Sequence, residues 1–320
     1  MGTFRLWSDE IEAMRAEARA VIDAGIGSGM FAVEPESGSD LSFDEQVAVA
    51  RESLAATTFP LPDTEEREIG GVACRVIRSE GTPRAIYLHF HGGGMISGSA
   101  SLMDIPNQML AQAHSVTVVS VEYRKAPEFP HPAGPDDGVA VAHALVEGVA
   151  AELGSERLLI GGESAGGYMA ATVALRVRDE LHAIDRVAGL NLTYGELDWS
   201  ANASQRGRRG ADGFDVLTPD FIRLSADCYV PGLTDDERRA PEISVLYANL
   251  HGLPSCFVSV GTCDHLLDDS LIFAARAVAA GVKVDLFVLP EMPHAFQVFD
   301  CEMTRAWSAA QAAWIESILA

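Results

Sequence analysis

The stretch that decides the fold is Leu158-Leu159-Ile160-Gly161-Gly162-Glu163-Ser164-Ala165-Gly166-Gly167. It begins as an apolar run typical of a buried strand and leads into residues 168–177, which favour a helix. The pattern G-x-S-x-G lies between the two. A chain that turns this sharply leaves no room for side chains at Gly162 and Gly166. The stretch therefore predicts a strand, a tight turn and a helix, with Ser164 exposed at the edge of a sheet beside a helix N-terminus.

Further apolar runs lie on both sides of this unit. Residues 72–76 alternate as in a half-exposed strand, and short apolar, β-rich runs occupy residues 85–90 and 116–121. Further runs of this kind occupy residues 157–160, 187–192, 256–260 and 282–289. Helical stretches, such as residues 138–153 and 165–181, separate several of these runs. Strands that alternate with helices predict an α/β protein with a mostly parallel sheet.

Two segments depart from this rhythm. Near the N-terminus, Ile11, Met14 and Ala18 recur at helical spacing, and helical character returns at residues 43–54. Residues 195–244 are polar and dotted with Gly and Arg, with one helix opened by Thr218-Pro219. We expect residues 1–60 to form the N-terminal helical part of a cap, residues 61–320 to form the main domain, and residues 195–244 to be a cap insertion.

A second glycine motif, His91-Gly92-Gly93-Gly94, directly follows the predicted strand 85–90. Three consecutive glycines cost backbone entropy, which implies that main-chain N–H groups must approach something closely. An oxyanion that forms during attack by Ser164 fits this requirement, with two N–H groups from the loop and a third from Ala165.

A serine hydroxyl needs a base within hydrogen-bond reach, and the base needs a carboxylate to orient it. In the expected chain order of serine, acid and histidine, His294 follows the strand 282–289 on a loop, and Asp264 follows the strand 256–260. The alternatives for the base are His182, His251 and His265, and those for the acid are Asp268 and Asp269. The two alternative acids fall at the start of a helix, where carboxylates ordinarily act as caps.

Together these residues resemble the hormone-sensitive lipase-like esterases, also called bacterial family IV, of the α/β-hydrolase superfamily. The resemblance covers residues 87–296. Besides the two glycine motifs it includes Tyr123-Arg124-Lys125-Ala126-Pro127-Glu128-Phe129-Pro130, similar to the family's Y-R-x-A-P-E block, and Asp264-His265-Leu266-Leu267-Asp268, similar to its D-P-L-x-D segment. The second similarity favours Asp264 over Asp268 as the acid.

The resemblance implies an α/β-hydrolase fold with about eight strands under a helical cap. It assigns the oxyanion hole to the N–H groups of Gly93, Gly94 and Ala165. The sequence departs from the family at Glu163, where Asp or Thr is usual, at His265, which replaces Pro, and at Ala295, which replaces Gly. Glu163 flanks the nucleophile, so we expect it to contact substrate or affect the local electrostatics.

The expected activity is hydrolysis of short- to medium-chain carboxylic esters through an acyl-enzyme on Ser164, with His294 as base and no cofactor. A lactone or amide hydrolase would use the same groups. A non-catalytic ligand-binding relative is the alternative from a different class, and the joint presence of Ser164, Asp264 and His294 argues against it. The histidines lack metal-ligand spacing, so no metal is expected.

Composition and charge exclude several classes of binding partner. The chain of 320 residues carries 46 acidic and 23 Lys or Arg residues, a formal net charge of −23, which argues against a nucleic-acid or anionic-membrane partner. No apolar run reaches membrane-spanning length, and acidic residues interrupt the N-terminus where a signal peptide would be apolar. The 5 cysteines are scattered and suit reduced thiols. We therefore expect a cytoplasmic enzyme that acts on a small-molecule ester and, at the level of the family, a possible homodimer.

Overall fold

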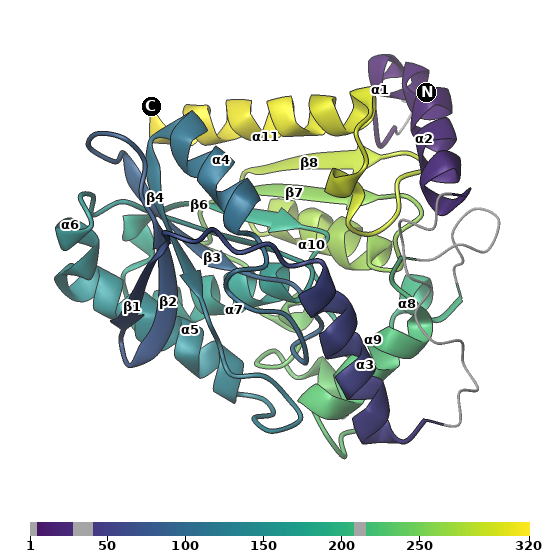
Figure 1. Ribbon diagram of the computed structural model, residues 1–320, viewed down its shortest axis with the longest axis horizontal. Coiled ribbons are helices and arrows are strands. Elements are labelled where there is room, and N and C mark those ends of the chain that lie inside the picture. The colour runs from purple at the N-terminus through teal and green to yellow at the C-terminus, as the bar shows by residue number, and fades with distance from the viewer. Residues whose placement is uncertain (1–4, 28–40, 208–215) are drawn as a thin grey trace.

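Eight strands form one sheet in the computed structural model, which describes residues 5–27, 41–207 and 216–320 (Figure 1). The strands are β1 (Glu65–Ile69), β2 (Val72–Ile77), β3 (Ala85–Phe90), β4 (Val116–Val121), β5 (Leu158–Glu163), β6 (Val187–Thr193), β7 (Ser255–Gly261) and β8 (Val284–Leu289). Their order in the sheet is β1-β2-β4-β3-β5-β6-β7-β8. The first two pairings, β1 with β2 and β2 with β4, are antiparallel, and all others are parallel. The predicted α/β-hydrolase fold with an eight-stranded, mostly parallel sheet is confirmed.

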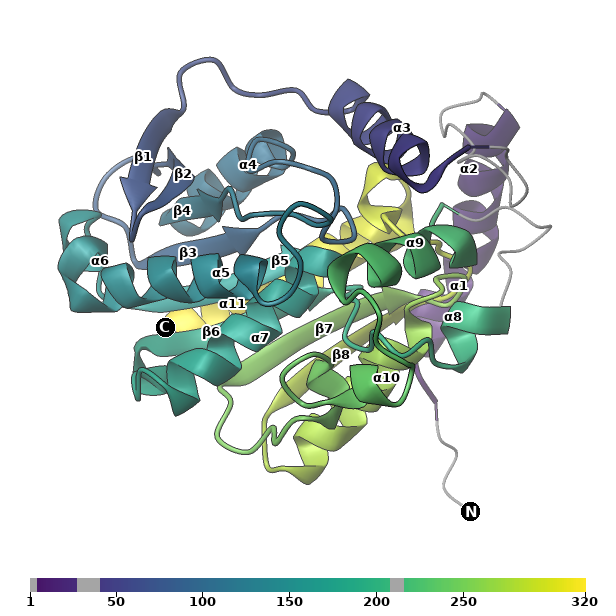
Figure 2. The same ribbon diagram turned by 90° about the horizontal axis from the view of Figure 1, so that it is seen from below.

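Helices cover both faces of the sheet. One face carries α4 (Asp104–His114) and α11 (Glu302–Leu319), and the other carries α5 (Ala133–Ala144), α7 (Ala165–Asp179) and α10 (Leu267–Ala279) (Figures 1 and 2). The predicted helix over residues 138–153 differs in detail, because α5 begins earlier and ends at Ala144. A π-helical turn (Leu145–Val149) and the short α6 (Ala150–Glu152) follow, and Gly148 interrupts the helix with a φ of 138°.

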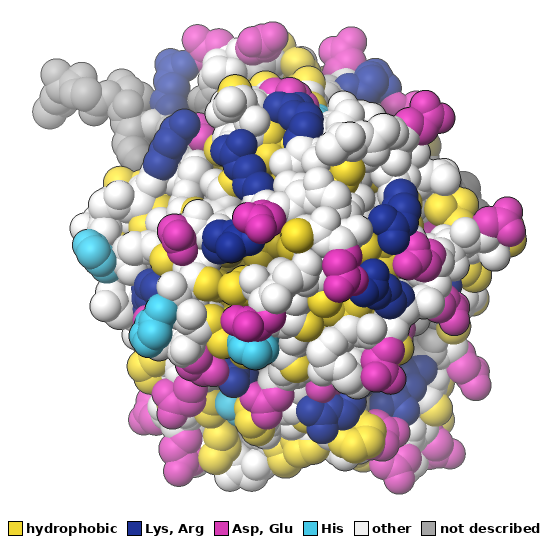
Figure 3. Space-filling view, turned by 90° about the vertical axis from the view of Figure 1, so that its left-hand side faces the viewer, with side chains coloured by type: hydrophobic (Ala, Val, Ile, Leu, Met, Phe, Trp, Pro, Cys, Tyr) yellow, Lys and Arg dark blue, Asp and Glu magenta, His cyan; other side chains and the backbone are white. Residues whose placement is uncertain are grey.

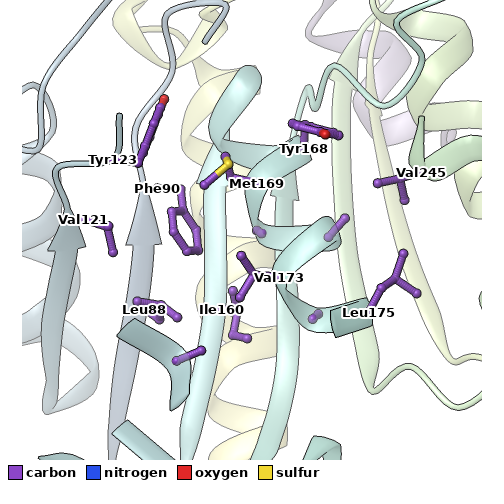
Figure 4. Close-up of a cluster of buried hydrophobic side chains, with 14 of the residues drawn as sticks. Leu88, Phe90, Val121, Tyr123, Ile160, Tyr168, Met169, Val173, Leu175 and Val245 are labelled. Carbon is purple, nitrogen blue, oxygen red and sulfur yellow. The ribbon is translucent and has the colours of Figure 1, made fainter. Parts of the chain in front are cut away.

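The central strands are buried on both faces, which explains their continuous apolar runs. Leu88 and Phe90 of β3 pack with Ile160 of β5 and Val173 of α7 on one face (Figure 4). Tyr87 and Leu159, their neighbours in sequence, belong to the cluster on the opposite face together with Trp314 of α11. The two clusters fix the register of the strands whose ends carry the functional site.

The remaining helices come from the two segments that interrupt the alternation of strands and helices. Before β1 lie α1 (Asp9–Ala13), α2 (Arg15–Gly27) and α3 (Phe43–Ala56), and between β6 and β7 lie α8 (Ala203–Gly207) and α9 (Pro219–Tyr229). Thr218 caps α9, as predicted, by accepting a hydrogen bond from the N–H of Phe221 (3.2 Å). Parts of both segments, residues 1–4, 28–40 and 208–215, lie outside the described residues.

Helices α3 and α9 lie side by side (Figure 2) and flank a groove. Val49 and Ala50 line it from α3, and Phe221 and Leu224 line it from α9. Arg51 of α3 forms hydrogen bonds to residues of the main domain. Its guanidinium donates to the Glu128 carboxylate (2.8 and 2.6 Å) and to the carbonyl oxygen of Ile96 (2.8 Å). This ion pair lowers the pKa of Glu128 to about 2.

The surface mixes charges of both signs on the face shown in Figure 3, where Lys and Arg side chains lie among Asp and Glu side chains. Ion pairs of this kind join Arg67 to Glu152 (2.7 Å) and Arg78 to Glu65 (2.9 Å). Within the part of the chain that the structure describes, no helix combines the length and apolar character needed to cross a membrane.

Candidate active site

Ser164 occupies the turn between β5 and α7 with φ 58° and ψ −124°. Such a conformation in a non-glycine residue costs about 1–3 kcal/mol and persists only when the surroundings enforce it. Here the enforcement is steric. A Cβ at Gly162 would lie 2.3 Å from the carbonyl oxygen of Phe90, and a Cβ at Gly166 would lie 1.9 Å from the same atom. Only glycine permits this approach, so the turn presents Ser164 as the motif predicted.

His294 and Asp264 are joined by a hydrogen bond of 2.8 Å between Nδ1 and Oδ2. The carboxylate is 1% exposed, and its other oxygen, Oδ1, accepts from the N–H of Leu266 (2.9 Å). Because Nδ1 donates to the carboxylate, the neutral imidazole has its lone pair on Nε2. Tyr194, at the end of β6, packs its ring against the imidazole with a centroid distance of 4.4 Å. The histidine is therefore oriented from two sides.

The loops that carry these two residues are tied together. The N–H of Cys263 donates to the carbonyl oxygen of Met292 (3.0 Å), and the N–H of Glu291 donates to Oγ1 of Thr262 (2.9 Å). A Cβ at Gly261 would lie 2.0 Å from the Met292 carbonyl oxygen, which explains the glycine at the end of β7. Ser164, Asp264 and His294 thus follow the carboxyl ends of β5, β7 and β8 at one edge of the sheet. Among the described residues no hydrogen bond joins the Ser164 hydroxyl to His294.

The loop His91-Gly92-Gly93-Gly94 follows β3 and lies against the turn of Ser164. A Cβ at Gly92 would lie 3.3 Å from the Ser164 Cβ. Gly93 and Gly94 have φ values of 120° and 59°, which favour glycine. Among the hydrogen bonds of the described chain, none uses the N–H of Gly93, Gly94 or Ala165 as donor. Three amides beside Ser164 can therefore donate to another group.

Tyr123 supports this loop, a role that sequence reasoning missed although the residue belongs to a quoted motif. Its hydroxyl donates to the carbonyl oxygen of His91 (2.7 Å), and its ring stacks on the imidazole at 4.2 Å. Burial lowers the pKa of His91 well below its usual range, so the ring is neutral and its Nδ1 can donate to the carbonyl oxygen of Gly92 (2.7 Å). Both contacts hold the glycine loop in place.

Glu163, which precedes the nucleophile, has a partner within the protein. Its Oε2 lies 3.0 Å from Nε2 of His89 on β3, and the side chain is 18% exposed. His89 in turn lies 2.9 Å from the hydroxyl of Ser120 and is 0% exposed. Contact between Glu163 and substrate stays a prediction.

Glu196, three residues after β6, is a buried carboxyl that belongs to none of the motifs recognised in the sequence. Its N–H donates to the carbonyl oxygen of Ser164 (3.2 Å), while its Oε1 is buried with no hydrogen-bond partner among the described residues. Burial and the neighbouring charge of Asp264 raise the pKa of Glu196 to about 8. In sequence it reads as one polar residue of a loop, so nothing there indicated that it would be enclosed.

The side chains that ordinarily bind metals are dispersed. Within residues 5–27, 41–207 and 216–320, no group of three or more His, Cys, Asp or Glu side chains has the arrangement needed to hold a metal ion. The arrangement of Ser164, His294, Asp264 and three unused amides suits nucleophilic acyl chemistry.

Known proteins share both the sequence and the fold. A family model described as α/β hydrolase fold matches residues 87–298. The carboxylesterase NlhH of Mycobacterium tuberculosis strain H37Rv is 34% identical, over 79% of this chain and 83% of that protein. An acetyl esterase of Salmonella schwarzengrund is 28% identical, over 76% of this chain and 74% of that enzyme.

Among solved structures, a hormone-sensitive lipase from a metagenome library superposes with a TM-score of 0.73 at 32% sequence identity, and covers 98% of both chains. Sequence and fold therefore agree. The chain belongs to the hormone-sensitive lipase-like (bacterial family IV) esterases of the α/β-hydrolase fold and is a carboxylic ester hydrolase.

Proposed function

We propose that Ser164, His294 and Asp264 are the catalytic triad of this esterase. The observation that carries the proposal is the 2.8 Å hydrogen bond from His294 Nδ1 to a fully buried Asp264, which leaves Nε2 as the proton acceptor. Apo geometry is often looser than that of a substrate complex, so a hydroxyl not yet bonded to the imidazole is compatible with this role.

The reaction proceeds in two steps. Ser164 Oγ attacks the ester carbonyl carbon while His294 Nε2 takes the hydroxyl proton, and the alcohol leaves with that proton. Water then attacks the acyl-enzyme, His294 takes a proton from the water and returns it to Ser164, and the carboxylic acid is released. Asp264 stabilises the imidazolium that forms in both steps.

The oxyanion of each tetrahedral intermediate is bound by the N–H groups of Gly93, Gly94 and Ala165. Their lack of other acceptors among the described residues supports this assignment. The N-terminus of α7 adds a favourable dipole beside the developing charge.

The substrates we propose are small-molecule esters with short to medium acyl chains. Helix α9 packs directly on the oxyanion loop, since a Cβ at Gly94 would lie 2.9 Å from the Phe221 ring and 2.2 Å from the Ser225 hydroxyl oxygen. This crowding leaves limited room above the glycine loop. Helices α2, α3 and α9, with the segments to which they belong, act as the cap, and Glu163 contributes to the substrate side of the site.

The test is hydrolysis of p-nitrophenyl esters from acetate to palmitate by the wild type, Ser164→Ala and His294→Ala. We expect turnover that peaks at short chains and is lost in both variants, while the exposed-histidine control His251→Ala keeps wild-type rates. Turnover that survives in Ser164→Ala would contradict the triad. A folded wild type that opens lactones or cleaves amides but no simple ester would move the assignment to those substrates.

A homodimer, a cytoplasmic location and the absence of nucleic-acid and membrane partners remain predictions. Light scattering across protein concentrations tests the first, fractionation of the source cells tests the second, and binding to duplex DNA and anionic vesicles tests the third.

A further inference from the structure

Glu291 lies on the loop between β8 and His294 in an unfavourable backbone conformation. Its φ of 65° falls in the left-handed region, where a Cβ crowds the following carbonyl and glycine is the cheaper residue. The main chain is held there by the bond from its N–H to Thr262 Oγ1 (2.9 Å), two residues before Asp264. A side chain kept at such a position is expected to have a contact that glycine could not make.

That contact is with the first residue of α2. Arg15 donates through Nε (2.7 Å) and Nη2 (2.5 Å) to Oε1 of Glu291, and Nη1 of Arg19 lies 3.9 Å from the second carboxylate oxygen. The Glu291 side chain is only 17% exposed, against 49% for Arg15. The ion pair is therefore partly shielded from solvent, which makes it stronger than a typical surface pair.

The rest of α2 packs beyond His294 on the same loop system. Ala18 and Ile22 are buried in a cluster with Phe296 and Met303, and the carboxylate of Glu17 accepts from the N–H of Glu302 (2.8 Å). In Figure 1, α2 lies beside the start of α11. Contacts from this one helix thus occur on both sides of His294 in the sequence.

We propose that Arg15 and Glu291 are positioning residues, which form a latch through which the N-terminal helix α2 holds the His294 loop in its productive orientation. This inference rests on the proposed role of His294 as the base. Opening the latch changes the alignment of the imidazole with Ser164 and Asp264, and it leaves the groove between α3 and α9 untouched. The effect therefore falls on kcat and not on KM.

The decisive variant is Glu291→Gly, because it relieves the backbone strain and removes the carboxylate at the same time. If Glu291 serves only the backbone, this variant equals or exceeds the wild type. If the latch positions His294, kcat for p-nitrophenyl butyrate falls about two- to five-fold, the range expected for loss of one partly shielded ion pair. KM and the far-UV circular dichroism stay those of the wild type.

A double-mutant cycle extends the test. Arg15→Gln and Glu291→Gln should each lower kcat, and the double variant should lose less than the two single losses combined, because both remove the same ion pair. The matched control is Arg67→Gln, which breaks a cross-element ion pair of similar length, Arg67 to Glu152 (2.7 Å), far from His294 in the sequence. It should leave kcat unchanged.

The outcomes separate the latch from the triad. Full kcat in Glu291→Gly and Arg15→Gln, with Ser164→Ala inactive, overturns the latch and leaves the triad intact. Activity that persists in Ser164→Ala overturns the triad whatever the latch variants do. Fully additive losses in the double variant, or a loss in kcat that Arg67→Gln shares, also overturn the latch.

Discussion

The turn that carries Ser164 and the loop that carries His294 end strands of the same sheet, and both need a glycine for close backbone approach, but the His294 loop depends more on side-chain bonds. Around Ser164 the backbone packs closely against Phe90, which is possible only because Gly162 and Gly166 have no Cβ that would overlap the Phe90 carbonyl oxygen. Around His294, two non-glycine residues, Glu291 and Ala295, adopt positive φ values of 65° and 55°. Side-chain bonds and packing hold this loop.

The difference teaches how each region responds to change. A turn fixed by backbone sterics is local, so only residues in contact with it affect it. A loop fixed by side chains depends on Asp264, Thr262 and Arg15, which come from two other parts of the chain, the loop after β7 and the start of α2. Four variants break or sharpen this contrast, in order of decreasing expected effect.

Asp264→Asn breaks the side-chain support of the imidazole. Because an amide favours the wrong tautomer of His294, we expect kcat to fall about 10⁴-fold with the fold intact. Steady-state kinetics on p-nitrophenyl butyrate measure the loss. The exposed Asp285→Asn on β8 serves as control and should retain full activity. A loss below tenfold would mean that the histidine is held by Tyr194 packing alone.

Gly166→Ala breaks the steric support of Ser164. The new Cβ would lie 1.9 Å from the Phe90 carbonyl oxygen, so the backbone must shift. We expect kcat/KM to fall about a hundred-fold and the free energy of unfolding to drop by about 1–3 kcal/mol. Urea titration and kinetics test both. Gly207→Ala, where no atom of the residues that the structure describes lies within 4 Å, is the control and should lose neither.

Glu196→Gln tests the buried carboxyl of Glu196, a residue whose N–H donates to the carbonyl oxygen of Ser164. Burial and Asp264 raise the pKa of Glu196 from an ordinary value of 4.5 to about 8. Between these values the folded state keeps a proton that the unfolded state has lost, so the stability of the wild type declines as pH rises through this window. The decline is on the order of 1 kcal/mol for each pH unit crossed between the two pKa values.

Glutamine removes this decline because it does not titrate. Urea unfolding at pH 5, 7 and 9 should therefore show a smaller loss of stability with pH for Glu196→Gln than for the wild type. The exposed Glu68→Gln on β1 should follow the wild type. Parallel curves for Glu196→Gln and the wild type would mean that Glu196 is ionised in the folded protein.

Ala295→Gly has the smallest expected effect and contrasts most directly with Gly166→Ala. Removing the Cβ relieves a left-handed conformation, and the extra freedom of glycine in the unfolded chain offsets part of the gain. We expect the free energy of unfolding to stay within about 1 kcal/mol of the wild type. In Ala309→Gly, at an exposed site on α11, the same exchange should destabilise by about 1 kcal/mol. Thermal unfolding compares the two, and an equal loss in both would contradict the strain at Ala295.

The sequence predicted the parts of the molecule that local patterns encode. Apolar runs located β3 to β7, because strands buried on both faces need such runs, and the edge strand β8 was located by a run that Asp285 interrupts. In contrast, β1 reads Glu65-Glu66-Arg67-Glu68-Ile69 and gave no such signal. The motifs also predicted that Asp264 contacts His294, and the hydrogen bond between the two side chains confirms that contact. The assignment of catalytic roles stays a prediction.

The remaining features depend on contacts between distant segments. Neither the enclosure of Glu196 nor the support of the glycine loop by Tyr123 can be read from a local pattern, because each requires the packed sheet edge. Helix α5 begins five residues before the predicted start, and the sequence did not indicate this because Gly134 and Pro135 are poor helix formers. Gly148 divides the stretch that periodicity predicted as a single helix.

The ion pair between Arg15 and Glu291 joins residues separated by 276 positions, which has a consequence for synthesis of the chain. At about 5–20 residues per second, roughly 15 to 55 seconds pass between the emergence of α2 and that of its partners. During that interval the apolar face of Ala18 and Ile22 has no Phe296 or Met303 to cover it. Helix α2 therefore leaves the ribosome long before it can dock, and a nascent chain that stalls before β8 exposes that face to chaperones and proteases.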